Sequence, residues 1–156
     1  MKLSKNLSLN ECLRSETAKR LGIDNTPDDE AILSNLKKVA VNIFQPLRDA
    51  FRTPIYVSSG YRCPELNRAI GGSKRSQHME GRALDLDADV YNGCTNAQIF
   101  NYIKENLDFD QIVWEFGTED NPDWVHVSYV SEDDNRKRCL VAKRDDKGKV
   151  YYEVLT

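Results

Sequence analysis

The sequence predicts an α+β fold, with helices in the first part of the chain and antiparallel strands in the later part. Three observations support this class. Apolar residues recur at helical spacing in the first third of the chain, whereas from residue 83 onward short runs alternate between apolar and polar residues. The composition, 156 residues with 40% hydrophobic and 30% charged, is ordinary for a globular protein. We therefore expect one domain spanning residues 1–156, large enough to fold without disulfides.

The N-terminal third predicts a short helix and loop, followed by one long helix. Residues 7–27 are polar and fit the short helix and its loop. Thr26 and Pro27, followed by three acids, have the features of a helix start. The helix then continues to about Phe51 despite Pro46, because apolar residues keep helical spacing throughout. They are Ile32, Leu33, Leu36, Val39, Ala40, Ile43, Phe44 and Leu47.

The rest of the chain predicts mainly strands, joined by short helices and loops. Gly60 ends the first strand, and a strictly alternating run of leucines and aspartates forms the second. The expected strands are residues 54–59, 83–89, 111–116 and 124–130, and a final hairpin of 139–142 and 150–154 with its turn at 145–148. The expected helices are 64–70 and 95–107, and residues 73–82 are expected to be a polar loop.

Composition also excludes several classes of partner. The formal net charge of −3 gives no general basic field, so we expect no nucleic-acid partner. No stretch approaches the ~20 apolar residues that span a bilayer, so we expect no membrane insertion. Residues 1–6 lack the apolar run of a signal peptide, so we expect the chain to be cytoplasmic as synthesised.

The only two histidines, His78 and His126, each lie in a segment suited to metal binding. Downstream of His78, Gly81 allows the chain to turn back, so that His78 and Asp85 can reach one ion. A face of a strand that carries only carboxylates (Asp85, Asp87 and Asp89) is costly to bury without a positive charge nearby.

His126 lies on a strand whose apolar residues point to the opposite face. If this strand pairs with the one that carries Asp85, the two side chains can lie within a few ångströms. Two imidazoles and one carboxylate suit a Zn²⁺ ion that keeps its fourth position open for water, as catalytic zinc does. We therefore predict one Zn²⁺ per chain.

Three motifs give this chain a specific resemblance. S-Q-H-M-E-G-R-A-L-D, residues 76–85, is similar to the S-x-H-x-x-G-x-A-x-D motif of the zinc D-alanyl-D-alanine carboxypeptidase family. D-W-V-H at 123–126 resembles the second motif of that family, and S-G-Y-R at 59–62 resembles a third, which carries an arginine. The resemblance covers roughly residues 30–130. It is closest to single-domain phage and prophage peptidoglycan peptidases of the L-Ala-D-Glu endolysin type.

The resemblance implies a fold and a metal site. The fold is that of hedgehog and DD-peptidase domains: an antiparallel β-sheet carries the zinc site and packs with N-terminal and crossing helices. His78, Asp85 and His126 would be the zinc ligands. The ion would activate a water molecule and polarise the scissile carbonyl.

The resemblance also places Asp123 as the general base. Strict strand alternation puts Asp123 on the opposite face from His126, so Asp123 must lie at the strand entry, before regular alternation begins. Glu115 is the alternative base, and a substrate-binding role for it is an equal possibility.

Other residues are expected to contact the substrate. Arg62 matches the arginine of the family that holds the substrate carbonyl or the developing oxyanion, a task suited to a permanent charge with fixed donors. Ser76 is expected to orient its loop or bind substrate, and Gln77 and Arg82 are expected to line the cleft.

By this resemblance the chain is a peptidase of peptidoglycan stem peptides, either a carboxypeptidase or an endopeptidase. A carboxypeptidase needs a cation for the terminal carboxylate, and Arg82, Lys74 and Arg75 are candidates. The absence of a signal peptide favours a lytic endopeptidase whose release depends on a holin. The alternatives are a non-catalytic zinc-containing binding module and a structural zinc or metal-free scaffold.

Overall fold

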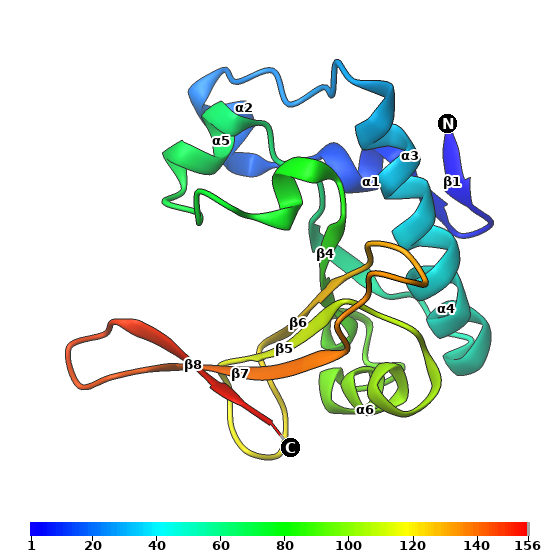
Figure 1. The fold of residues 1–156 in the computed structure, drawn as a ribbon, viewed down its shortest axis with the longest axis vertical. Coiled ribbons are helices and arrows are strands. Elements are labelled where there is room, and N and C mark those ends of the chain that lie inside the picture. The colour runs from blue at the N-terminus through cyan, green and yellow to red at the C-terminus, as the bar shows by residue number, and fades with distance from the viewer. Residues whose placement is uncertain (156) are drawn as a thin grey trace.

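A six-stranded sheet organises the molecule, as the computed structural model shows (Figure 1). The structure describes residues 1–155, and Thr156, the last residue of the predicted domain, lies outside them. The strands lie in the order β3 (Tyr56–Ser59), β4 (Ala83–Asp87), β6 (Trp124–Ser128), β5 (Gln111–Glu115), β7 (Arg138–Arg144) and β8 (Val150–Val154). All neighbouring strands are antiparallel except β5 and β7, which are parallel. The predicted α+β class is confirmed.

The long N-terminal helix is present but begins later than predicted. It is a continuous rod of α3 (Glu30–Val39), a π-helical turn η1 (Ala40–Phe44) and α4 (Gln45–Phe51). The predicted start at Thr26 is wrong, because the side chain of Asp29 caps the helix by accepting the backbone N–H of Ala31 at 2.8 Å.

The π-helical turn explains how the rod passes Pro46. Proline lacks an N–H and clashes with the carbonyl four residues earlier in an α-helix. Here the backbone N–H of Gln45 reaches back five residues, to the carbonyl of Ala40, and this wider turn precedes the proline. The helix therefore continues to Phe51, as predicted.

The N-terminal segment holds more structure than the predicted helix and loop. It forms a two-stranded ribbon, β1 (Lys2–Ser4) with β2 (Leu7–Ser8), and two short helices, α1 (Leu9–Leu13) and α2 (Glu16–Leu21). Asn25 then ties this segment to the loop that follows β3: its Nδ2 donates to the carbonyls of Leu13 and Tyr61, and its Oδ1 accepts the N–H of Cys63.

The helices α5 (Pro64–Ala69) and α6 (Asn96–Asn106) lie close to their predicted positions. The predicted strand 83–89 is too long, because β4 ends at Asp87 and a 3₁₀ turn, η3 (Ala88–Tyr91), follows. The amide of Asn96 causes this exit: its oxygen accepts the N–H of Ala88 at 2.7 Å and its nitrogen donates to Asp87 at 3.0 Å.

The core lies on one face of the sheet, beneath α6 and the α3–α4 rod. Ile99 and Ile103 of α6 are fully buried there with inward residues of the strands, namely Leu84, Leu86, Ile112, Val125 and Val127. The helices thus cover one face of the sheet and leave the other for the site described next. Within residues 1–155, no helix has both the length and the apolar character needed to cross a membrane.

Candidate metal centre and cleft

Three potential metal ligands converge on the open face of the sheet. β4 and β6 are neighbours, and their register places Asp85 directly opposite His126. Asp85 Oδ1 lies 3.0 Å from His126 Nδ1 and 3.3 Å from His78 Nε2. One ligand atom from each residue lies within 4.8 Å of the other two. The structure therefore brings together the three residues that the sequence singled out.

A short 3₁₀ turn, η2 (Gln77–Glu80), aims His78 at this point. Ser76 caps the turn, and Gly81 ends it in the left-handed conformation, with φ of +73°. A β-carbon at Gly81 would also lie 2.7 Å from the carbonyl of Ile32. Only glycine fits a turn that packs this closely on α3.

The orientation of His78 is typical of a metal-binding histidine. The ring is 2% exposed, and its Nδ1 lies 2.7 Å from the carbonyl oxygen of Gly60. A hydrogen bond from one ring nitrogen to a backbone carbonyl fixes the tautomer and leaves the other nitrogen free to bind metal. That other nitrogen, Nε2, faces Asp85.

The ionisation states of these donors also fit a cation. Burial lowers the pKa of His78, which favours the neutral imidazole that metals require. Burial alone would raise the pKa of Asp85, but His78 and His126 beside it hold that pKa well below its usual range. A carboxylate between two imidazole nitrogens is a donor set suited to Zn²⁺.

The other two aspartates of this segment turn away from the centre. Asp87 accepts the amide of Asn96, and Asp89 accepts the amide of Asn121 at 2.7 Å. Both carboxylates therefore organise the chain between β4 and α6 and the loop before β6. Neither belongs to the group of potential ligands.

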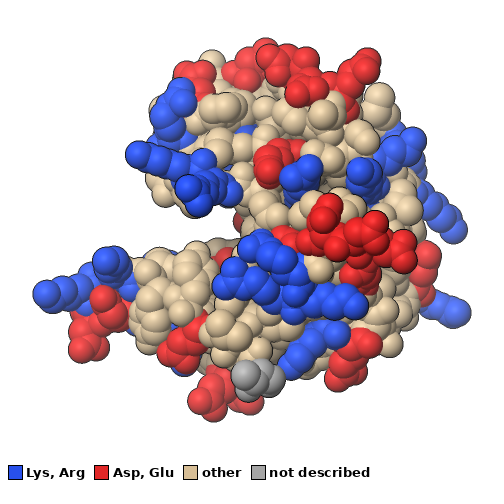
Figure 2. All heavy atoms as spheres, in the orientation of Figure 1, with Lys and Arg blue, Asp and Glu red and all other residues tan. Residues whose placement is uncertain are grey.

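The three ligands lie in a cleft of about 790 Å³. Figure 2 shows this hollow between the upper part of the molecule and the sheet with its C-terminal hairpin. Above it lie Arg62 and residues 71–73 and 75–77, and below it lie side chains of β5, β6, β7 and β8. The metal centre is thus open to a ligand rather than enclosed in the core.

Glu115 lines this cleft beside the metal centre. Val113 of β5 pairs with His126, so Glu115, two residues further on the same face, is a diagonal neighbour of His126. Such neighbours lie about 7–8 Å apart, within reach of a long side chain. Glu115 is 9% exposed, and burial raises its pKa to about 7, with Asp85 adding to the rise and His126 opposing it.

Asp123 has a different position from the one that its motif implies. It directly precedes β6, at the strand entry as expected, but it is exposed and is not among the described residues that line the cleft. Its backbone is held by Glu115, whose carbonyl accepts the Asp123 N–H at 2.9 Å. The structure therefore brings Glu115, rather than Asp123, to the three ligands.

Arg62 and Ser76 lie together at the wall of the cleft. The Arg62 guanidinium donates to Ser76 Oγ at 3.1 Å, and the Arg62 backbone N–H donates to the carbonyl of His78. Arg62 Nε is buried and has no hydrogen-bond partner within residues 1–155. A guanidinium that lines a cleft is suited to an anionic or carbonyl oxygen of a ligand.

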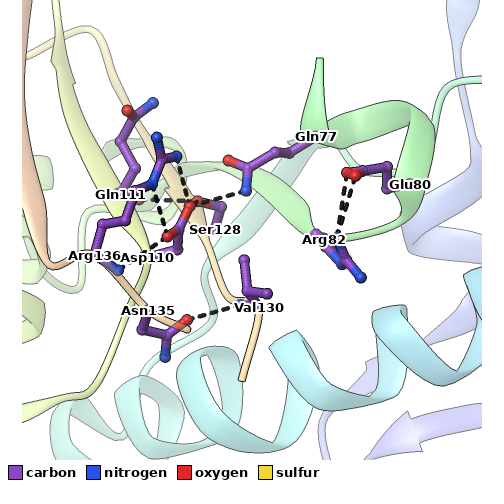
Figure 3. Close-up of polar contacts among 9 residues, drawn as sticks. All are labelled: Gln77, Glu80, Arg82, Asp110, Gln111, Ser128, Val130, Asn135 and Arg136. Carbon is purple, nitrogen blue, oxygen red and sulfur yellow. Dashed lines mark hydrogen bonds and ion pairs between the residues drawn. The ribbon is translucent and has the colours of Figure 1, made fainter. Parts of the chain in front are cut away.

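Gln77 lines the cleft but is held by a buried acid that the sequence did not single out. Gln77 Nε2 donates to Asp110 Oδ2 at 2.9 Å, and Asp110 also accepts two bonds from the Arg136 guanidinium, at 2.8 and 3.0 Å (Figure 3). Asp110 is 1% exposed, and although burial raises its pKa, the bonds from Arg136 and Gln77 bring it down to about 2. The acid thus fastens the turn beside His78 to the sheet.

Arg82 was expected to line the cleft, and the structure does not bring it there. Its guanidinium pairs with Glu80 at 3.2 Å on the far side of the η2 turn (Figure 3). Arg82 precedes β4, which begins at Ala83, so strand alternation does not set the direction of its side chain.

Replacing Asp110 with alanine should lower the free energy of unfolding by about 1–3 kcal/mol, because it removes the buried acceptor that the side chains of Gln77 and Arg136 share. Urea unfolding of the metal-free protein measures this change. Glu153→Ala is the matched control, since it removes only the exposed pair with Lys143. Equal stabilities of the two variants would contradict the role of Asp110.

The cleft also contains residues that were not predicted from the sequence. Arg138 and Arg144 lie on β7, and Tyr152 lies on β8, all on the cleft face. The available signal was alternation: arginine, leucine, alanine and arginine occupy every second position of residues 138–144. That pattern predicts a shared face, but it does not say that the face adjoins the metal centre.

Comparison with known families gives one match. A family described as peptidase M15 matches residues 5–128, and this range contains all three potential metal ligands together with Arg62, Glu115 and Asp123. The C-terminal hairpin of β7 and β8 lies beyond the matched range. No curated protein matches the chain.

Proposed function

The chain belongs to the peptidase M15 family of metallopeptidases, and on that premise we propose that it hydrolyses peptide bonds in peptidoglycan stem peptides with a zinc ion. One observation carries the proposal: His78, Asp85 and His126 converge at an open cleft instead of in a closed core. Three protein ligands and room for a fourth position are what a hydrolytic zinc site requires.

His78, Asp85 and His126 would hold the ion. When bound, zinc supplies Lewis-acid polarisation of the scissile carbonyl and a water of lowered pKa. The protein's own part is to fix the ligand directions: Gly60 orients His78, and the β4–β6 register places Asp85 against His126.

We assign the general base to Glu115. It reaches the cleft beside the ligands, whereas Asp123 is exposed outside the lining. A buried carboxylate with a pKa near neutrality can accept a proton from the attacking water and deliver it to the leaving amine. Asp123, which the motif resemblance favours, is the alternative.

Arg62 is proposed to hold the substrate carbonyl as its oxygen becomes negative. It lies at the wall of the cleft, and its buried Nε has no partner within residues 1–155. Ser76 fixes the guanidinium and caps the turn of His78, so we propose a positioning role for Ser76. Gln77 would also position that turn through Asp110.

The proposal also covers which peptide bond is cut, an internal one or the C-terminal one. Of the cations considered for a terminal carboxylate, Arg82 is paired with Glu80, whereas Arg75 lines the cleft. The open cleft supports an endopeptidase of the endolysin type, which would act on the cell wall after release from the cytoplasm by a holin. A D-Ala-D-Ala carboxypeptidase is the alternative activity.

Digestion of purified peptidoglycan by the zinc-loaded protein tests the function. We expect soluble fragments whose new termini, identified by mass spectrometry, all report one type of cleaved peptide bond. Protein stripped of metal by a chelator is the control and should release nothing. Retention on peptidoglycan without any new terminus would instead identify a zinc-containing binding module.

A further inference from the structure

The cleft is strongly cationic, although the chain as a whole is acidic. Its lining contains five arginines and only two carboxylates, Asp85 and Glu115. The arginines are Arg62, Arg75, Arg136, Arg138 and Arg144. Since the chain carries a formal net charge of −3, these cations are concentrated where a ligand would bind. A cleft of one sign attracts ligands of the opposite sign.

Of the five arginines, Arg75, Arg138 and Arg144 form no ion pair with a carboxylate within residues 1–155. Arg136 is paired with Asp110, and Arg62 is engaged with Ser76. Arg138 and Arg144 both lie on the cleft face of β7. They flank an apolar stretch, because the intervening cleft-facing positions are Leu140 and Ala142.

The side chain of Arg144 is oriented by an aromatic ring in a way that suits anion binding. Its guanidinium carbon lies 4.1 Å from the centre of the Phe116 ring, a cation–π contact. Phe116 in turn packs edge-to-face on Trp124, which precedes His126 by two residues. Stacking fixes the plane of the guanidinium and leaves its N–H edge free for a carboxylate.

Tyr152 adds an aromatic surface to the cleft from β8, the edge strand beside β7. Ala142 lies opposite Glu115 of β5 on one side and opposite Tyr152 of β8 on the other. Because the alanine side chain is small, it leaves room for the tyrosine ring. Tyr152 is 57% exposed and lines the cleft. An exposed aromatic ring beside unpaired cations is typical of a binding surface, not of a core.

We propose that the cleft face of the β7–β8 hairpin is a subsite for a free carboxylate of an extended peptide substrate. Arg144, whose guanidinium stacks on Phe116, binds the carboxylate, and the peptide chain packs on Tyr152. The proposal rests on the proposed peptidase function and adds to it the anionic part of the substrate. Peptidoglycan stem peptides suit this subsite because they carry free carboxylates along their length.

The distance to the metal centre sets the length of the substrate. β7 lies two strands from β6, or about 10 Å at a strand spacing of ~4.8 Å, and an extended peptide advances ~3.3 Å per residue. The carboxylate would therefore lie at least about three residues from the scissile bond. A dipeptide cannot occupy both places, so the hairpin selects longer peptides.

Peptide binding to the zinc-loaded Glu115→Gln protein tests the subsite without turnover. The probe is a synthetic stem tetrapeptide in two forms, one with a free glutamate carboxylate and one with that group as a carboxamide. Calorimetric titration should show that Arg144→Gln weakens binding of the carboxylate form about tenfold. Binding of the carboxamide form should be unchanged by this substitution.

The hairpin supplies its own matched controls. Lys143→Gln removes one positive charge from the same strand but on the opposite face, where Lys143 pairs with Glu153. Tyr151→Ser likewise truncates an exposed tyrosine next to Tyr152 but on the other face. Both controls should bind like the parent, whereas Tyr152→Ser should weaken both forms of the peptide.

Three results would overturn the subsite: equal affinities for Arg144→Gln and Lys143→Gln, an equal loss for both peptide forms, or no binding of either form to the parent. If wild-type protein still cuts peptidoglycan in these cases, only the subsite proposal is overturned. If Arg144 binds the carboxylate but no bond is cut, the subsite stands and the peptidase assignment fails. A dimer that Tyr152→Ser abolishes and Arg144→Gln does not would identify a second copy of the chain as the occupant, and would also overturn the proposal.

Discussion

Replacing Glu115 with glutamine is expected to reduce peptidoglycan hydrolysis by about 10²–10⁴-fold, the usual contribution of a general base. Glutamine keeps the shape of the side chain but cannot accept the proton of water. Zinc content should stay near one per chain, because Glu115 is outside the ligand group. Release of peptide termini and metal analysis of the same preparation measure both results.

Asp123→Asn is the matched control, since it makes the same chemical change eight residues away in an exposed position. It should cut at close to the wild-type rate. A large loss of rate in Asp123→Asn with normal rates in Glu115→Gln would assign the base to Asp123, as the motif resemblance implies. Loss of zinc in Glu115→Gln would show instead that Glu115 supports the metal.

A stability measurement checks the environment of Glu115 independently of turnover. Burial raises its folded pKa to about 7 from 4.5, so its stabilising contribution is fully present below pH 4.5 and is lost as pH rises through 7. In metal-free protein at pH 8, Glu115→Gln should therefore be more stable than wild type by up to about 3 kcal/mol. The difference should vanish near pH 4.5.

The second large effect concerns the metal ligands. His126→Ala should weaken zinc binding by at least about 100-fold. Structural zinc sites gain roughly 10–16 kcal/mol from about four ligands, and each 1.4 kcal/mol corresponds to a factor of ten. Because zinc binds the folded form, added zinc should raise the melting temperature of wild type and leave that of His126→Ala unchanged.

Asp85→Asn and Asp87→Asn form a matched pair for the same test. Both change one aspartate of β4, yet only Asp85 lies against the two imidazoles, whereas Asp87 bonds to Asn96. Asp85→Asn should therefore lose zinc, and Asp87→Asn should retain it. Equal zinc content in these two variants would contradict the assignment of Asp85 as a zinc ligand.

Much of the site could be predicted because it depends on local pattern. Alternation in β4 and β6 assigned Asp85 and His126 to faces free of the apolar residues, and pairing of those strands brings the two together. The turn that carries His78 was predictable in the same way, since Gly81 marks the reversal of the chain. These features are set by residues close together in the sequence, apart from the choice of one strand neighbour.

The choice between Glu115 and Asp123 was not predictable, because it depends on where β6 begins and on its register with β5. The placement of Arg82 also depends on where the strand begins, since alternation applies only inside the regular element. The pairing of Asp110 with Gln77 joins positions 33 residues apart, which no local pattern specifies.

By itself, then, the sequence determined the α+β class, the three potential ligands and the motifs of a zinc peptidase, because side-chain type and short-range period decide these. Only the tertiary structure decided which acid faces the ligands and that the arginines of the C-terminal hairpin line the same cleft. The physical reason is that β7 joins the sheet beside β5, its parallel neighbour. Packing of the whole sheet determines that β7 lies beside β5. This pairing brings side chains from the C-terminal part of the chain to a site built from residues in the middle of the chain.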